Sequence, residues 1–300
     1  MNITKIEYHG LNQYLKSKYG HKVYKVAING NFTCPNRDGT VGTRGCIFCS
    51  GKGSGDFCPE GSLSVKRQLD EGISRIEKKI GARETCTYIA YFQAFTNTYG
   101  PIEKLKKLFY EAIEDERVEI LSIATRPDCL SDEVVFLLAE LNKIKPVWVE
   151  LGLQTIHEKS ARYIRRGYEL SVYDEAVRKL KAAGIAVITH VILGLKDESL
   201  EDMVKTVEYV AKTGTFGIKL QLLHVLKDTD LYEEYLAGKV KTLSLQEYID
   251  ILVKCVSVLP DDMIVHRLTG DGDKKILAAP LWSADKKHVL NEISKYLKPI

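Results

Sequence analysis

Short runs of β-branched and aromatic residues alternate with longer amphipathic segments from residue 22 to about residue 225. Such runs are typical of strands, whereas apolar residues spaced three and four apart are typical of helices. The predicted strands are 22–28, 87–93, 119–125, 146–153, 185–193 and 217–225. The predicted helices are 63–80, 101–115, 131–142, 171–183 and 199–212, with Ser131 and Ser171 as expected N-caps. This order predicts an α/β fold with six β/α repeats on a parallel sheet.

The residues beyond 225 form a different pattern, which predicts a C-terminal α/β extension. It contains a predicted helix at 244–258, a strand at 263–268, a Thr-Gly-Asp-Gly turn and a final helix from about residue 285. The expected division is therefore an N-terminal segment 1–21, a core 22–225 and an extension 226–300.

Polar residues follow the predicted strands at their C-terminal ends. Gln93 with Asn97, Arg126 and Gln154 each lie where a strand ends, and a loop rich in cysteine follows the first strand. In parallel β/α barrels the active site is built at this end of the strands. The sequence therefore predicts a partial (β/α)6 barrel with its site at that rim.

Three cysteines punctuate the loop CPNRDGTVGTRGCIFC at a C-x11-C-x2-C spacing: Cys34, Cys46 and Cys49. Thiolates at such spacing hold zinc or an iron–sulfur cluster. A structural zinc uses four ligands and an electron-transfer cluster uses four cysteines, so three leave one metal position open for chemistry. An alternative is a structural zinc whose fourth ligand is Cys58 or His21.

Composition narrows the setting more than the function. The 300 residues carry a net charge of +3, which is compatible with nucleic acid but too weak to indicate it. No apolar run approaches the roughly 18 residues of a membrane span, and the first ten residues lack the apolar core of a signal peptide. Seven cysteines, an odd number, favour a reducing compartment, so a cytoplasmic protein without membrane contact is expected.

Several segments resemble the radical S-adenosylmethionine (SAM) superfamily, in the branch of the Elongator catalytic subunit. The likeness lies in VELGLQT at 149–155, TRPD at 125–128, RRG at 165–167 and GLKDES at 194–199, together with the expanded first cysteine gap. A small stand-alone bacterial family shares the C-x11-C-x2-C spacing, a YFQAFTNTY-type strand and an HRLTGDG-type segment. The usual superfamily spacing is C-x3-C-x2-C, and positions 196 and 197 are Lys and Asp where Pro and Gly are usual.

The resemblance implies roles for individual residues. Cys34, Cys46 and Cys49 are expected to ligate a [4Fe–4S] cluster whose fourth iron binds SAM. The expected SAM contacts are Phe48 near adenine, Gln93 and Asn97 near the methionyl group, Glu150 and Gln154 on the fourth strand, and Arg166 at the SAM carboxylate. Arg suits that carboxylate because its fork binds both oxygens.

The same resemblance implies a radical SAM enzyme acting on tRNA, with an electron donor such as flavodoxin or ferredoxin. The implied reaction is conversion of the wobble base 5-carboxymethylaminomethyl-uridine towards 5-aminomethyl-uridine. Alternatives are radical chemistry on a small porphyrinogen-like molecule, or a zinc-stabilised nucleic-acid-binding protein. Arg267 and Asp271 are expected on the substrate side, and His190 is read equally well as a satisfied core histidine or as part of the site wall.

Overall fold

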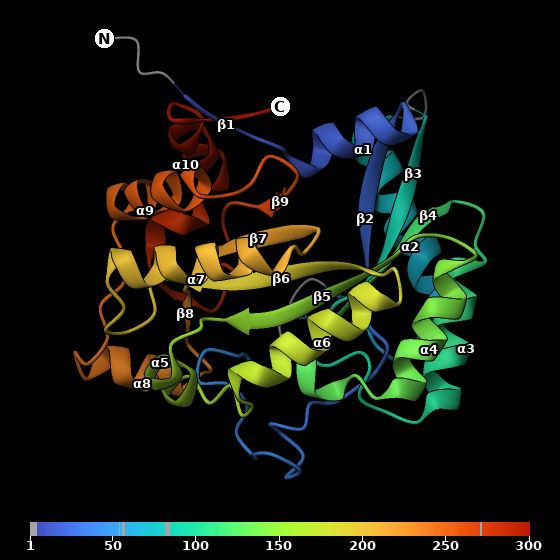
Figure 1. Ribbon diagram of the computed structural model, residues 1–300, viewed down its shortest axis with the longest axis horizontal. Coiled ribbons are helices and arrows are strands. Elements are labelled where there is room, and N and C mark those ends of the chain that lie inside the picture. Colours follow the sequence, from blue (N-terminus) through green and yellow to red (C-terminus); the bar gives the residue numbers. More distant parts are fainter. Residues whose placement is uncertain (1–4, 54, 56–57, 82–84, 271) are drawn as a thin grey trace.

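The fold is built on one curled parallel sheet. The computed structural model describes residues 5–53, 55, 58–81, 85–270 and 272–300. Seven strands hydrogen-bond in the order β2-β3-β4-β5-β6-β7-β9. Their bounds are β2 (Lys22–Ile28), β3 (Cys86–Phe92), β4 (Val118–Thr125), β5 (Val147–Gln154), β6 (Ala186–Leu193), β7 (Gly217–Leu222) and β9 (Ile264–Arg267). In Figure 1 the strands turn from upright β2 and β3 to nearly horizontal β5, β6 and β7, which gives a half-barrel. The predicted α/β partial barrel is confirmed.

Helices cover the outer face of this sheet. They are α2 (Val65–Ile80), α3 (Ile102–Ile113), α4 (Asp132–Asn142), α6 (Leu170–Ala182), α7 (Leu200–Thr213) and α9 (Leu245–Ser257). Ser131 caps α4 as expected, and Ser199 caps α7; each accepts a hydrogen bond from a backbone N–H of the first turn. The cap expected at Ser171 is wrong. Leu170, which packs against the core, already begins α6, and the N-cap is Glu169.

The seventh strand comes from the segment expected as an extension. β9 pairs in parallel with β7 and closes the order of the sheet. The strand expected at 217–225 divides, because β7 ends at Leu222 and the short β8 (Val225–Leu226) pairs with β10 (Leu277–Ala279). Sheet and extension are thus joined by backbone hydrogen bonds.

A helix absent from the sequence prediction fills the open seam of the half-barrel. α1 (Leu11–Tyr19) packs against both edge strands, β2 and β9, and the backbone N–H of Val265 donates to the carbonyl of His9 at 2.8 Å. Beside it, β1 (Ile6–Tyr8) pairs with β11 (Leu297–Pro299), which brings the two ends of the described chain together (Figure 1). The remaining helices are α5 (Glu158–Tyr163), α8 (Asp230–Leu236) and α10 (Lys286–Ile293).

The inside of the half-barrel is layered, because alternate residues of each strand face inward. Near the N-terminal strand ends lies an apolar layer of Leu15, Val23, Ile89, Ile120, Trp148 and Ile188. Two residues further along the strands lies a polar layer of Lys25, Tyr91, Ser122, Glu150, His190 and Lys219. The apolar layer fills one end of the half-barrel, and the main cavity opens on the other side of the polar layer.

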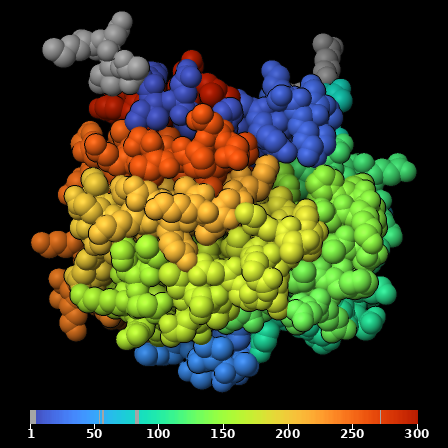
Figure 2. Space-filling model, in the orientation of Figure 1, coloured from blue at the N-terminus to red at the C-terminus, as the bar shows by residue number. Residues whose placement is uncertain are grey.

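The cysteine loop, residues 34–49, lies at that entrance. In Figure 2 blue atoms of the early part of the chain project at the lower edge of the molecule, where Figure 1 places this loop. Within the described residues, no helix is both long and apolar enough to cross a membrane.

Candidate active site

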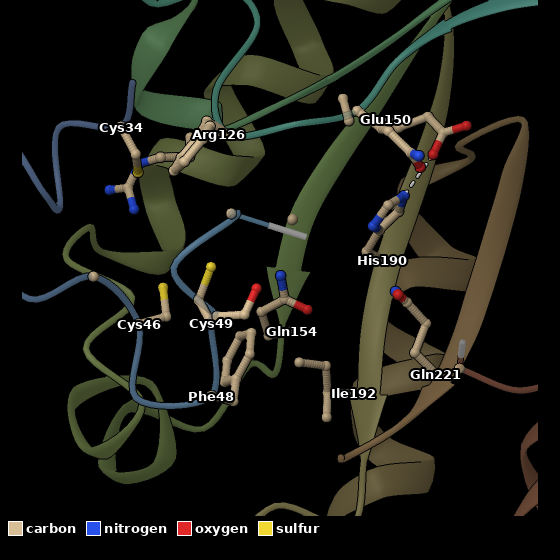
Figure 3. A pocket seen from close by; sticks show the side chains of 18 of the residues that line it. Cys34, Cys46, Phe48, Cys49, Arg126, Glu150, Gln154, His190, Ile192 and Gln221 are labelled. Atoms are coloured by element: carbon tan, nitrogen blue, oxygen red, sulfur yellow. Dashed lines mark hydrogen bonds and ion pairs between the residues drawn. The ribbon is translucent and has the colours of Figure 1, made fainter. Parts of the chain in front are cut away.

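A cavity of about 300 Å³ opens at the C-terminal ends of the strands. Cys34, Cys46 and Cys49 line one wall, and Glu150 and His190 line the opposite wall (Figure 3). Three thiols from one loop and a polar layer from the sheet therefore face each other across a single space.

The cysteine loop is held by bonds to segments distant in sequence. The Arg37 guanidinium donates to the carbonyl of Cys49 at 2.9 Å and to that of Ser50 at 2.6 Å. The side-chain amide of Asn36 donates to the carbonyl of Arg165 at 2.6 Å, and the backbone N–H of Leu231 donates to that of Ile47 at 3.0 Å. Arg37 thus closes the loop on its own C-terminal end, and the turn after α5 and α8 hold it from outside.

The surroundings of the thiols suit an anionic metal cluster. Asn36 Nδ2 donates to Cys46 Sγ at 3.5 Å, and the Arg126 guanidinium interacts electrostatically with Cys34 and Cys46. Burial raises the pKa of the Cys46 thiol to about 12, so this thiol keeps its proton until a metal displaces it. Hydrogen bonds and positive charge at sulfur are what an iron–sulfur cluster needs around its ligands. These residues fit the expected group.

The zinc alternative loses one of its two possible fourth ligands. His21 lies beside the first residue of β2, at the end of the strand opposite the cysteine loop, and bonds Thr87 Oγ1 at 2.9 Å. Cys58 is not among the described residues that line the cavity.

Arg166 lines the cavity but is bonded within the chain at every guanidinium nitrogen. Its partners are the carbonyls of Tyr168 at 3.0 Å and Thr155 at 2.7 Å and the carboxylate of Glu158 at 3.1 Å. Only 2% of the residue is exposed. The geometry gives it a role in building the turn beneath the cysteine loop, which differs from the expected contact with a ligand carboxylate.

Gln154 has the properties of a ligand contact. It lines the cavity at the end of β5 with a left-handed φ of 70°, where the register of β5 against β6 is interrupted. Its Oε1 is buried, and no group in the described part of the chain bonds it. An orphaned buried acceptor is destabilising unless a ligand supplies a donor, so this atom fits a bound donor group.

Of three other expected SAM contacts, the structure places two at the cavity and one away from it. Phe48 and Gln93 line the cavity, Phe48 partly buried against Ile192 and its neighbours. Asn97 is fully buried, and its amide donates to the carbonyl of Ala124 at 2.9 Å. It is not among the described cavity-lining residues, because its position ties one strand end to the next.

Glu150 is fully buried and accepts from four side chains. Oε1 accepts from Lys25 at 3.1 Å and from Ser122 at 3.0 Å, while His190 lies 2.7 Å from Oε2 and Lys219 also bonds that oxygen. Burial opposes its charge, but the two lysines and His190 hold the pKa of Glu150 well below its usual range. Its acceptor capacity is filled by the polar layer, which makes it an internal anchor of the site.

Of the two residues expected on the substrate side, the structure describes only one. Arg267 ends β9 and lines the cavity. Asp271 lies outside the described residues.

Two site residues escaped the sequence prediction. Lys25 and Lys219 are charged residues inside mostly apolar strands, and their ammonium groups lie 4.8 and 4.7 Å from the ring centre of Tyr91. A charged residue within a buried strand is the signal that could have identified them. Only the strand register shows that these two positions face inward.

Comparison with known proteins decides the family. The radical SAM superfamily domain matches residues 38–210, and the radical SAM C-terminal domain matches residues 216–299. The chain belongs to the radical SAM superfamily. It is therefore a radical SAM enzyme. Its sequence is 45% identical to that of YtqA of Bacillus subtilis, over 98% of this chain and 91% of that protein.

Two more distant similarities cover different shares of the chain. It is 27% identical over 188 residues to the tRNA uridine(34) acetyltransferase of Methanocaldococcus jannaschii, covering 61% of this chain and 34% of that protein. The structure of Methanocaldococcus infernus Elp3 matches with a TM-score of 0.65 at 20% identity, over 90% of this chain and 63% of that one. The second likeness concerns the fold alone.

Proposed function

We propose that this radical SAM enzyme binds a [4Fe–4S] cluster through Cys34, Cys46 and Cys49 and modifies the wobble uridine of tRNA. The carrying observation is that these three thiols line the same cavity as the polar layer, in a radical SAM half-barrel. When bound, the cluster and SAM supply a 5′-deoxyadenosyl radical that abstracts hydrogen from the substrate.

The chain's own residues bind and orient. Asn36 and Arg126 stabilise the thiolates, Phe48 offers an apolar face, and Gln93 and Gln154 offer amide groups to SAM. The apolar layer behind the polar layer excludes water from the far end. A reaction of this class depends on such positioning more than on a nucleophile.

Two observations support the proposed substrate: the similarity to a tRNA-modifying relative and the exposed basic residues near the cavity. A relative of the core is named for tRNA uridine 34, and the bacterial family resemblance suggests 5-carboxymethylaminomethyl-uridine as the base acted on. Arg44 and Lys52 are exposed and stand next to Gly45 and Gly53, which line the cavity, and Arg162 in α5 is exposed as well. Phosphate contacts of this kind weaken as salt rises. Lys286 and Lys287 start α10, which lies at the end of the molecule opposite the cysteine loop (Figure 1), so they are not part of this surface.

The cofactor proposal is tested by anaerobic reconstitution with iron and sulfide and electron paramagnetic resonance of the reduced protein. A [4Fe–4S] signal that shifts on adding SAM is expected for the wild type and for Cys86→Ser, a control at the far end of β3. Cys34→Ser, Cys46→Ser and Cys49→Ser are each expected to lose the cluster. Bound zinc, or a cluster indifferent to SAM, would overturn the proposal.

The substrate proposal needs its own test. The reconstituted enzyme with SAM and a chemical reductant is incubated with tRNA bearing 5-carboxymethylaminomethyl-uridine, and the nucleosides are analysed by mass spectrometry. Formation of 5-aminomethyl-uridine, with binding that weakens steeply between low and moderate salt, is expected. Turnover of a free porphyrinogen in place of the tRNA would assign the enzyme to the small-molecule alternative.

A further inference from the structure

His190 has two faces, and only one is used within the chain. It lines the cavity from β6, and 15% of its side chain is exposed. Its Nε2 lies 2.7 Å from Oε2 of Glu150. In the part of the chain that the structure describes, no group bonds its other ring nitrogen, Nδ1.

The contact with Glu150 determines which nitrogen carries the hydrogen. An ionised carboxylate can only accept hydrogen bonds, so Nε2 must be the donor. Glu150 is ionised because Lys25 and Lys219 also bond it. Burial, reinforced by the positive charge of Lys219, lowers the pKa of His190 to about 4, so the ring is neutral near pH 7. A neutral ring that donates from Nε2 has a lone pair on Nδ1.

The lone pair faces the space where a substrate would lie. Figure 3 shows Nε2 joined to Glu150 and the second ring nitrogen turned to the side of Gln154 and the cysteines. Gln221 and Ile192 continue the same wall toward the entrance. The ring cannot rotate away without breaking the bond to a carboxylate that is itself fixed by three further donors.

We propose that Nδ1 of His190 accepts a hydrogen bond from a substrate N–H group, and that Glu150 and Lys219 are positioning residues for it. This rests on the proposed function, because the glycine-like appendage of the modified uridine carries such a group, its secondary amine. A fixed neutral acceptor favours a substrate that has an N–H group at that position. A base that lacks this N–H group cannot form the hydrogen bond to His190.

Two substitutions separate the two faces of the ring. In His190→Asn the amide lies near the place of Nδ1, so a polar group remains on the cavity side. In His190→Gln the amide reaches toward Nε2, so only the Glu150 side is kept. A purely structural role predicts the opposite ranking, since His190→Gln preserves the internal bond.

The measurement is the dissociation constant of an anticodon stem–loop RNA carrying 5-carboxymethylaminomethyl-uridine, with reconstituted holoenzyme and SAM. His190→Gln is expected to weaken binding about tenfold or more, and His190→Asn much less, as a hydrogen bond to a charged or strongly polar donor implies. With a control RNA carrying 5-carboxymethyl-uridine, which has no appendage amine, the two variants should match the wild type. Equal losses in both variants, or equal losses with both RNAs, would overturn the contact.

A second readout does not depend on the RNA. Nitrogen-15 magnetic resonance of histidine-labelled oxidised holoenzyme, assigned with His190→Asn, should show the neutral ring protonated at Nε2. An imidazolium, or a hydrogen on Nδ1, would overturn the inference whatever the substrate. If the wild type neither binds nor converts the RNA, the proposed function fails and the named donor with it; if it converts the RNA while the variants are indistinguishable, the function stands and the contact fails.

Discussion

Asn36 lies against Arg165, its Nδ2 donating to that carbonyl at 2.6 Å. The same nitrogen lies 3.5 Å from Sγ of Cys46. One buried amide therefore joins the cysteine loop to the turn after α5 and also supports a thiol of the proposed cluster, although the two segments are 129 positions apart in the chain.

Asn36→Ala should loosen the loop around the cluster. Removing the amide leaves the Arg165 carbonyl without this donor, which implies a fall of about 1–3 kcal/mol in the free energy of unfolding. The reconstituted variant should hold less iron per chain and lose it faster to a chelator than the wild type. Asn291→Ala, at an exposed position of α10, is the matched control. Iron retention equal to that control would show that the bond does not brace the site.

Glu150→Gln should destabilise the barrel strongly. The substitution leaves Lys219, whose side chain is 3% exposed, and Lys25 without their counter-charge, and breaking a buried ion pair from one side costs about 3–5 kcal/mol. Urea denaturation measures the change. Glu175→Gln breaks an exposed pair with Arg178 and should change the free energy of unfolding very little, because water screens exposed ion pairs.

The double variant Glu150→Gln with Lys219→Met adds a further check. Removing the buried ammonium together with the carboxylate should recover part of the lost stability. A loss for Glu150→Gln no greater than for Glu175→Gln would mean that water reaches the polar layer and screens it.

Periodicity predicts the sheet and its covering helices because long amphipathic segments alternate with apolar strands. It also predicts a strand at 263–268, where β9 lies, but it does not show that this strand joins the main sheet by pairing with β7. The cysteine ligands and the strand-end glutamines follow from local spacing and from family resemblance. The partners of Arg166 do not, because two of the three are backbone carbonyls, which any sequence supplies.

The polar layer shows a second limit. Each of its charged members is one residue in an apolar strand, and only the register places Lys25, Glu150 and Lys219 at one depth. A buried carboxylate suggests a ligand contact until its donors are known. The donors to Glu150 come from four other strands, β2, β4, β6 and β7. The interpretation of Glu150 therefore changes from a ligand contact to an internal anchor.

Stability should fall as the pH drops through the range set by His190. The folded protein has a His190 pKa of about 4, below the ordinary value of 6.5, because burial and Lys219 disfavour the charged ring. Between these values the unfolded chain binds a proton that the folded chain does not, so acid favours unfolding. The contribution is at most about 1.4 kcal/mol for each pH unit.

Urea denaturation of the wild type and His190→Asn between pH 7 and pH 4.5 measures this contribution. The free energy of unfolding should decline more steeply for the wild type, because the variant has no ring to titrate. His266, whose pKa burial also lowers well below 6.5, is present in both proteins and leaves the difference unchanged. Glu150, whose pKa lies well below 4.5, affects the curve only at lower pH. Parallel curves for the two proteins would mean that the His190 ring is not held neutral by its surroundings.

Gln154→Gly should separate ligand binding from stability. The wild-type residue holds a left-handed φ of 70°, and its buried Oε1 has no hydrogen-bond partner among the described residues; both features are destabilising in the absence of a ligand. Glycine relieves the backbone strain but adds freedom to the unfolded chain, so the free energy of unfolding should change by less than about 1 kcal/mol. Loss of the amide should weaken SAM binding about tenfold, the effect of one good hydrogen bond.

Equilibrium binding of SAM to the reconstituted protein, followed by the change in its electron paramagnetic resonance signal, gives the affinity. Gln246→Gly is unsuitable as a control because it breaks a helix, so Gln13→Ala on the outer surface of α1 serves instead. An affinity equal to that of Gln13→Ala would show that Oε1 of Gln154 meets a donor other than SAM. A large loss of stability would show that the residue acts on the fold, through the β5 strand end, and not on the ligand.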